Sequence, residues 1–351
     1  MGEVGVCINV TGTLPSAGDL AALGLMHGWL RTPVQGPLSL LDRLNSLPAS
    51  VQVVVTLNNE CAEVRSDWSG WTTALRTLVE QFGARVRAVA CGNELDALPN
   101  VSAEFAADLV RQALPILRPH NIRTIATSVV GPDWPAYLNR LVMACGTDQP
   151  DYYDAHFYGK GFAGLAQEPN FGTVAAGIET ARVLSGNRPI ALTEGGVKIG
   201  DAGGPTGQAD YVRRWVRLVR SLSADNVPFG TYFALYDQVG APNERGDHAF
   251  GLVAEDGQRR PAWSAFAEAN GAEPGSSTAG RAAGAAQPVP TLVSLAESLP
   301  NPHLLEQVAT WQRLRRQNRE DPNDWEAFRA FEKAIGAPDP GPTEAQGFHS
   351  S

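Results

Sequence analysis

The sequence predicts a (β/α)₈ barrel followed by a linker and a short helical appendage. Short apolar runs rich in Val, Ile and Ala alternate with longer segments of helical period, a pattern typical of parallel sheets. Eight such runs fall within about 270 residues, close to the size of about 250 residues usual for this barrel. A doubly wound open sheet is the competing fold, but no glycine-rich phosphate loop follows the first run.

Strands are expected where β-branched and small apolar residues run together between turn residues. The eight candidates are Val4–Val10, Gly28–Thr32, Val51–Leu57, Val86–Cys91, Ile122–Val129, Tyr152–Phe157, Pro189–Leu192 and Phe229–Leu235. Helical period is clearest in Ser102–Leu117 and in Gln208–Leu222. A last barrel helix is expected to begin at Pro261, because proline is tolerated at the first helical position.

The chain after the barrel changes in composition. Residues 1–270 form the predicted barrel, and residues 271–290 are rich in Gly, Ala and Pro, which is typical of a flexible linker. Residues 291–351 predict a helical tail with two amphipathic helices, Pro302–Gln317 and Pro322–Ile335, and a disordered end. Two short helices bury little alone, so we expect them to dock on the barrel or on a protein partner.

The totals exclude several classes of protein. A formal charge of −9 argues against a nucleic-acid surface, and no apolar run approaches the roughly 20 residues that span a bilayer. No secretory signal precedes the first strand, so we expect a cytoplasmic protein or one released by lysis, as virion-associated proteins are. The four cysteines are scattered and predict free thiols rather than a zinc site or disulfides: Cys7, Cys61, Cys91 and Cys145.

Two predicted strands end in a glutamate. Glu94 follows the run Val86–Cys91 through Gly92 and Asn93, and Glu194 follows Pro189–Leu192 and precedes two glycines. The carboxyl ends of barrel strands form the floor of the active site. A pair of carboxyl groups at that floor is the arrangement that splits glycosidic bonds.

Motifs at further strand ends extend this pattern over residues 3 to 270. They are Trp29-Leu30-Arg31, Gly92-Asn93-Glu94, His156-Phe157-Tyr158, Thr193-Glu194, Phe250-Gly-Leu-Val and Arg260-Pro-Ala-Trp. In this order the motifs resemble those of the clan A glycoside hydrolases, retaining enzymes built on a (β/α)₈ barrel. The resemblance implies a retaining β-glycosidase that acts on a carbohydrate without a metal or cofactor.

The resemblance also implies roles for single residues. Glu94 matches the general acid/base and Glu194 the nucleophile, whose carboxyl groups should lie about 5–5.5 Å apart. Arg31 should lie beside Glu194 and keep it ionised, and Tyr158 should donate a second hydrogen bond to it. In the same way, Asn93 should hold the sugar 2-hydroxyl and His156 should line the same subsite.

Three further binding residues are weaker candidates. Asn58 follows the third strand and Trp68 comes soon after, where it would stack on a sugar ring. The family commonly has a tryptophan at the end of the eighth strand, and this chain has none there. Phe233 or Tyr236 would supply the aromatic floor instead.

Each of these residues also has a structural explanation. A strand-end Glu can pair with an arginine or cap a helix, and loop asparagines commonly serve turns. Asp154, Asp237 and Glu60 are alternative carboxylates that rank below the chosen pair. A second function class therefore stays open, an inactive barrel that binds carbohydrate or builds a larger assembly such as a phage particle. A barrel enzyme of unrelated chemistry lacks support, since the sequence shows no metal-ligand cluster or cofactor motif.

Overall fold

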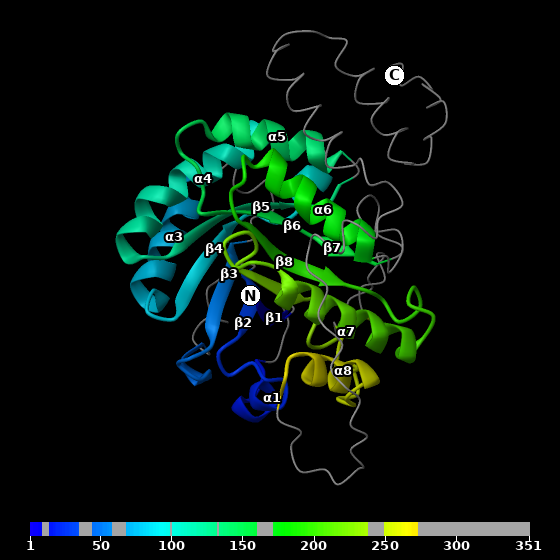
Figure 1. The fold of residues 1–351 in the computed structure, drawn as a ribbon. Coiled ribbons are helices and arrows are strands. Elements are labelled where there is room, and N and C mark those ends of the chain that lie inside the picture. Colours follow the sequence, from blue (N-terminus) through cyan, green and yellow to red (C-terminus); the bar gives the residue numbers. More distant parts are fainter. Residues whose placement is uncertain are drawn as a thin grey trace, which may run out of the picture. The chain divides into compact units, whose positions relative to one another are not determined.

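The computed structural model confirms the predicted fold class, a closed barrel of parallel strands surrounded by helices (Figure 1). It describes residues 1–8, 14–34, 44–57, 68–98, 100–131, 133–159, 171–237 and 249–272. The predicted linker beyond residue 272 and the predicted helical tail lie outside these ranges and stay predictions.

The strands follow one another around the barrel in chain order. They are β1 (Glu3–Cys7), β2 (Trp29–Val34), β3 (Gln52–Leu57), β4 (Val86–Cys91), β5 (Arg123–Val129), β6 (Tyr152–Ala155), β7 (Phe157–Tyr158), β8 (Ile190–Gly196) and β9 (Phe229–Tyr232). Parallel pairing of β6 with β8 and of β9 with β1 closes the ring. Both β6 and β7 pair with β8, so together they form the sixth of the eight strand positions of the barrel.

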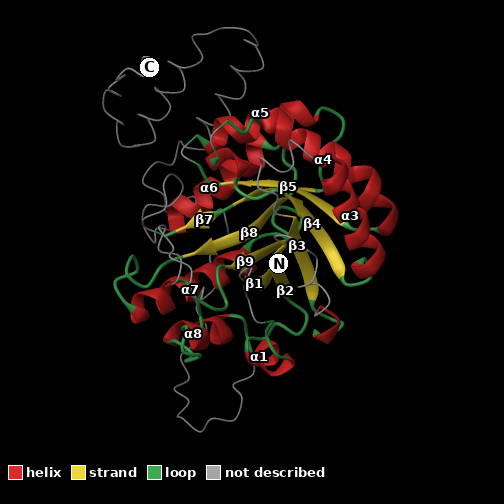
Figure 2. Cartoon of the chain, turned by 180° about the vertical axis from the view of Figure 1, so that it is seen from behind, coloured by secondary structure: helices red, strands yellow, loops and turns green. Residues whose placement is uncertain are grey.

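The helices lie on the outside of the strands (Figures 1 and 2). They are α1 (Ala17–Ala22), α3 (Trp68–Phe82), α4 (Ala103–Leu117), α5 (Trp134–Cys145), α6 (Phe171–Leu184), α7 (Pro205–Ser221) and α8 (Pro261–Ala269), with the 3₁₀ turns η2 (Leu95–Ala97) and η3 (Arg118–His120). Helix α4 starts where predicted, because the Ser102 hydroxyl accepts from the backbone N–H of Phe105 at 3.2 Å. Within the described ranges, every helix is too short or too polar to cross a bilayer.

Several predicted strand limits were wrong, among them that of the second strand, which runs on to Val34 instead of ending at Thr32. The sixth strand is interrupted at His156, the seventh extends through Glu194 to Gly196, and the eighth ends at Tyr232. At the sixth and seventh strands the difference lies where polar side chains and glycines follow the apolar run, whereas the eighth strand is followed by the apolar residues Phe233, Ala234 and Leu235. The predicted thiols are free and buried at Cys7, Cys91 and Cys145, while Cys61 lies outside the described residues.

The barrel interior changes from apolar to polar along the strands. Near the amino ends Trp29 stacks on Phe229 with ring centroids 4.0 Å apart, and small side chains such as Ala88 fit around them. Side chains alternate along a strand, so Arg31 points to the same side as Trp29, one layer higher. The other interior residues at that level are also small or polar, and they are buried: Cys7, Thr127, Asp154, Thr193 and Thr231. This polar layer is the floor on which the candidate site is built.

Candidate active site

Glu194 stands on β8, and the two glycines after it explain how β8 packs. A Cβ on Gly195 would meet the Trp215 ring of α7 at 2.3 Å, and one on Gly196 would meet the Phe233 carbonyl oxygen at 2.2 Å. Both neighbours can approach β8 closely only because these side chains are missing. The glycines therefore fix the backbone that carries the carboxyl group.

Both oxygens of Glu194 accept hydrogen bonds from buried donors. Arg31 Nη1 donates to Oε1 and the Tyr158 hydroxyl donates to Oε2. Burial raises the pKa of the Glu194 carboxyl above its ordinary value, while the positive charges of Arg31 and His156 oppose that rise. These contacts are the ones that the resemblance implied, but the pKa of Glu194 is not held down as expected, because burial outweighs the two cations.

Arg31 also joins Glu194 to the turn after β4. Its Nη2 donates to Asn93 Oδ1 at 2.6 Å, so the guanidinium fork spans an amide and a carboxylate. Asn93 Oδ1 in addition lies 3.5 Å from the Ser128 hydroxyl of β5. The carbonyl end of the Asn93 amide is therefore held in place by protein donors.

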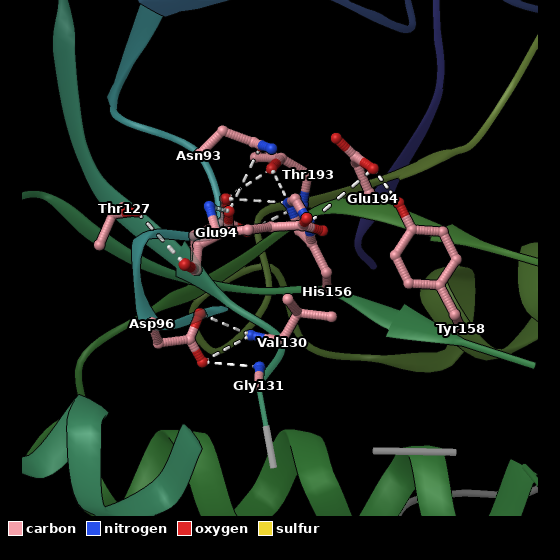
Figure 3. Close-up of polar contacts among 12 residues, drawn as sticks. Asn93, Glu94, Asp96, Thr127, Val130, Gly131, His156, Tyr158, Thr193 and Glu194 are labelled. Carbon is pink, nitrogen blue, oxygen red and sulfur yellow. Dashed lines mark hydrogen bonds and ion pairs between the residues drawn. The ribbon is translucent and has the colours of Figure 1, made fainter. Parts of the chain in front are cut away.

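Glu94 adopts a left-handed backbone conformation, with φ 49° and ψ 42°, which is uncommon for a residue other than glycine. The end of β5 holds this turn. The Ser128 hydroxyl accepts from the Glu94 N–H at 2.9 Å, and Asp96 accepts from the N–H groups of Val130 at 2.9 Å and Gly131 at 2.7 Å (Figure 3). These contacts position Glu94 from its backbone rather than from its side chain.

His156 lies between the two glutamates. Its Nδ1 is 2.7 Å from Glu94 Oε1 and 3.8 Å from Glu194 Oε2, and its Nε2 is 2.9 Å from the Thr193 hydroxyl (Figure 3). Burial alone would lower the pKa of the ring, but Glu194, Asp154 and Glu94 outweigh burial and raise the pKa of His156 to about 10. At neutral pH the ring is an imidazolium, a fixed positive charge beside both glutamates.

The two carboxyl groups approach each other closely. An oxygen of Glu94, a ring nitrogen of His156 and an oxygen of Glu194 all lie within 4.8 Å of one another. Retaining glycosidases have carboxyl groups about 5–5.5 Å apart, and inverting ones about 6.5–9.5 Å. Three such donors are also a conceivable cation site, but the Arg31 guanidinium on Glu194 and the charge on His156 would repel a metal ion.

An aromatic group borders the Glu194 side of the site. The Tyr158 ring meets Phe233 edge-on at 6.1 Å and Phe250 at 5.5 Å, and Val130 packs with them. Phe233 and Tyr236 were the two residues predicted as alternatives for the aromatic floor. Of these, Phe233, which follows β9, belongs to this aromatic group. Tyr236 instead bridges to Val253, outside this group.

The structure brings together six of the nine predicted site residues through direct contacts: Arg31, Asn93, Glu94, His156, Tyr158 and Glu194. Burial raises the pKa of Tyr236 to about 12, and the charges that act on it are Asp19 and Arg259, so its place in a binding site stays a prediction. Asn58 lies outside the described residues. Trp68 begins α3, and its side chain is not among those described.

Some residues that contact and position the catalytic candidates were not predicted as site residues from the sequence. Ser128 and Asp96 were not predicted, and Asp154 was ranked below the chosen pair. Asp154 is buried on β6, accepts from Thr193 and lies 3.6 Å from His156 Nε2. Its position two residues before His156 was the available signal, because alternate residues of a strand share one face.

No family model matches the sequence, and no curated protein is similar enough to count as a relative. Solved structures are similar in fold. A family 39 glycoside hydrolase from Bacteroides cellulosilyticus is 19% identical with a TM-score of 0.55, over 76% of this chain and 63% of that one. A family 5 subfamily 18 enzyme from Streptomyces cattleya, solved with GlcNAc, is 18% identical with a TM-score of 0.57, over 76% of this chain and 79% of that one.

These solved glycoside hydrolases share the barrel fold of this chain. A β-glucuronidase from Ruminococcus gnavus, in complex with uronic deoxynojirimycin, has it too, with 14% identity and a TM-score of 0.56, over 77% of this chain and 50% of that one. This chain spans less than two thirds of the length of the Bacteroides and Ruminococcus proteins. The likeness shows the fold alone, and the chemistry of this chain is inferred from its own residues.

Proposed function

We propose that this chain is a retaining glycoside hydrolase that cleaves a β-linked glycan by double displacement. The observation that carries the proposal is the approach of Glu94 and Glu194 to within 4.8 Å, with a different set of partners on each. Glu194 is held by Arg31 and Tyr158, and Glu94 by His156. Two carboxyl groups in different environments are what a separate nucleophile and acid require.

In the first step Glu194 attacks the anomeric carbon while Glu94 protonates the leaving oxygen. The bond to the aglycone breaks as the glycosyl–enzyme ester forms. In the second step Glu94 takes a proton from water, and that water releases the sugar from Glu194 with retained configuration. Arg31 stays on Glu194 throughout and stabilises it when it leaves again as a carboxylate.

The buried charges of the site favour one added proton. Three carboxyl groups, Glu94, Glu194 and Asp154, face two cations, Arg31 and His156. If all five were charged, the site would carry one excess negative charge in a poorly solvated place. A proton on one carboxyl group removes that excess, and Glu94, with 15% of its side chain exposed, is the carboxyl group that a substrate can reach.

Asn93 is proposed to bind the sugar at its 2-hydroxyl. Arg31 occupies the carbonyl oxygen of the amide, which orients the Nδ2 group as the donor. A hydrogen bond to the 2-hydroxyl strengthens as the ring becomes oxocarbenium-like. Phe233 and Tyr158 are proposed as the apolar wall against which the sugar rests.

The test is hydrolysis of a panel of activated aryl β-glycosides by wild type and Glu194→Gln. We expect one or more substrates to turn over, and Glu194→Gln to lose at least about 10³-fold in kcat with an unchanged circular dichroism spectrum. Glu268→Gln is the matched control, since that glutamate is 70% exposed on α8. Equal turnover by wild type and Glu194→Gln would refute the nucleophile.

The inactive-barrel alternative predicts another outcome of the same experiment. Wild type would then hydrolyse none of the panel and still bind oligosaccharides, with Glu194→Gln binding as tightly as wild type. Calorimetry with the same sugars separates the two functions.

A further inference from the structure

Asp154 is a buried carboxylate that takes no part in the two steps above. Only 1% of its side chain is exposed. Its Oδ1 accepts from the Thr193 backbone N–H at 3.0 Å, and its Oδ2 accepts from the Thr193 hydroxyl at 2.5 Å. Burying a carboxylate is costly unless neighbouring donors satisfy it, so its partners indicate what it does.

These contacts fix the direction of the hydrogen bonds around His156. The Thr193 hydroxyl has one hydrogen, and Asp154 can only accept it. The Thr193 oxygen then offers lone pairs to His156 Nε2 at 2.9 Å, so Nε2 must carry a hydrogen. The other ring nitrogen, Nδ1, faces Glu94 Oε1 at 2.7 Å.

We infer that Asp154, acting through Thr193, is a positioning residue that keeps a hydrogen on His156 Nε2 and so holds the ring as an imidazolium facing Glu94. This inference rests on the proposed function. The ring donates no proton to the substrate. Its fixed charge favours the Glu94 carboxylate that forms each time Glu94 gives up its proton to the leaving oxygen.

The charges around the ring agree with this role. Four carboxyl groups act on His156, those of Glu94, Asp96, Asp154 and Glu194. The Tyr158 ring adds an edge contact at 6.2 Å. Arg31 is engaged by Glu194 and Asn93, so the carboxyl groups dominate the surroundings of the imidazole. A buried cation is stable where carboxylates such as those of Asp154 and Glu194 face it.

The change Asp154→Asn keeps the shape of the side chain but reverses the direction of the hydrogen bonds that link residue 154, Thr193 and His156. The Thr193 backbone N–H can only donate, so the amide oxygen of the new side chain must face it. Its Nδ2 then points at the Thr193 hydroxyl, which has lost the acceptor for its own hydrogen and can turn to donate to His156 Nε2. An Nε2 that accepts cannot carry a hydrogen, so the imidazolium is lost. Serine proteases show the same kind of tautomer error when the aspartate beside the histidine of their triad is changed to asparagine.

The experiment combines ¹⁵N NMR of the histidine rings with steady-state kinetics. His156 is assigned by loss of its signals in His156→Gln. In wild type at pH 8 we expect both ring nitrogens of His156 to be protonated, and in Asp154→Asn only one. We expect kcat of Asp154→Asn to fall roughly 10²-fold with KM within about twofold of wild type.

Three further variants separate positioning from folding. Thr193→Val should behave like Asp154→Asn, since it removes the hydroxyl that links Asp154 to the ring, while Thr193→Ser should keep the doubly protonated ring. Asp151→Asn is the matched control, because Asp151 precedes β6 at the other end of the same strand and pairs with Arg123. It should change neither the spectra nor kcat.

Two results would overturn the inference: a wild-type ring with one unprotonated nitrogen at pH 8, or a ring that stays doubly protonated in both Asp154→Asn and Thr193→Val. Both are read from spectra and do not depend on turnover. A wild-type chain that hydrolyses no glycoside would instead defeat the proposed function, and the spectra would still decide the state of the ring.

Discussion

Arg31 contacts both halves of the proposed machinery, because one nitrogen of its fork is bonded to Glu194 and another to Asn93. A lysine ammonium is a single point of charge and cannot hold both groups in that geometry. We expect Arg31→Lys to keep the fold and to lose about 10²-fold in kcat, with the pH dependence of kcat shifted as well. Steady-state kinetics on the best aryl glycoside measure this.

The control for Arg31→Lys is Arg259→Lys, which alters an arginine that is 53% exposed and paired with Asp19. We expect wild-type kinetics from it, because exposed ion pairs contribute little. Wild-type kcat in Arg31→Lys would contradict a role for the fork.

Glu94 should show the signature of a general acid and base. In Glu94→Ala, a substrate with a good leaving group needs no protonation and should form the glycosyl–enzyme readily, whereas a poor leaving group should depart slowly. Added azide should then accelerate turnover and give a β-glycosyl azide, because it replaces the water that Glu94 activates. An azide product of inverted configuration, or no dependence on the leaving group, would argue against this role.

The charge of His156 should also be visible in stability. Its folded pKa of about 10 lies above the ordinary value of 6.5, so the folded chain holds a proton that the unfolded chain releases. The stabilisation is complete below about pH 6.5 and is lost as the pH rises towards 10, with a slope of up to about 1.4 kcal/mol per pH unit. Urea titrations between pH 6.5 and 7.5, below the range where most unfolded cysteines ionise, should show the start of this fall in wild type. A flat profile in wild type, or the same slope in His156→Gln, would contradict it.

At the level of residues, the sequence predicts those site residues whose positions follow from the ends of strands. Glu94, Glu194, Arg31 and Tyr158 each stand at or near the carboxyl end of a recognisable strand, and the barrel brings those ends together. The left-handed turn at Glu94 could not be predicted, since it depends on hydroxyl and carboxylate contacts with β5 made only after folding.

At the level of elements, the close packing of β8 on α7 depends on Gly195. A Cβ there would overlap the Trp215 ring, so Gly195→Ala should lower the free energy of unfolding by about 1–3 kcal/mol and disturb the neighbouring Glu194. Gly200→Ala is the matched control, because an added Cβ meets nothing within 4 Å. Denaturant unfolding of the two variants measures the difference. Equal stabilities would contradict the packing argument.

Element limits were the least predictable part of the fold. The run Tyr152–Phe157 gave one expected strand, and the structure divides it at His156, whose backbone N–H bonds to Val129 of β5 while Phe157 pairs with β8. Strand β6 also pairs with β8, so the division lies within one strand position of the closed barrel. Apolar runs predict where a strand lies, and polar tertiary contacts decide where it stops.

At the level of the whole molecule, the barrel closes without any residue beyond 272. Strands β1 and β9 pair directly, and Asn270 after α8 donates to the carbonyl oxygens of Leu23 and Gly24 at 2.9 and 3.1 Å. We expect a chain cut after Ala272 to unfold cooperatively and to keep the kinetics of the full chain. Its association state, compared by light scattering, reports what residues 273–351 add. A cut chain that fails to fold would contradict an independent barrel.

The central claim is that Glu194 becomes covalently bonded to the sugar while Glu94 lies beside it as acid and base. The most direct measurement is intact and peptide mass spectrometry after incubation with 2-deoxy-2-fluoro aryl β-glycosides, whose fluorine slows release of the glycosyl–enzyme. The account predicts one added fluoroglycosyl group, on the peptide that contains Glu194, and none in Glu194→Gln. Label on another residue, or a turned-over substrate that leaves Glu194 unlabelled, would contradict it.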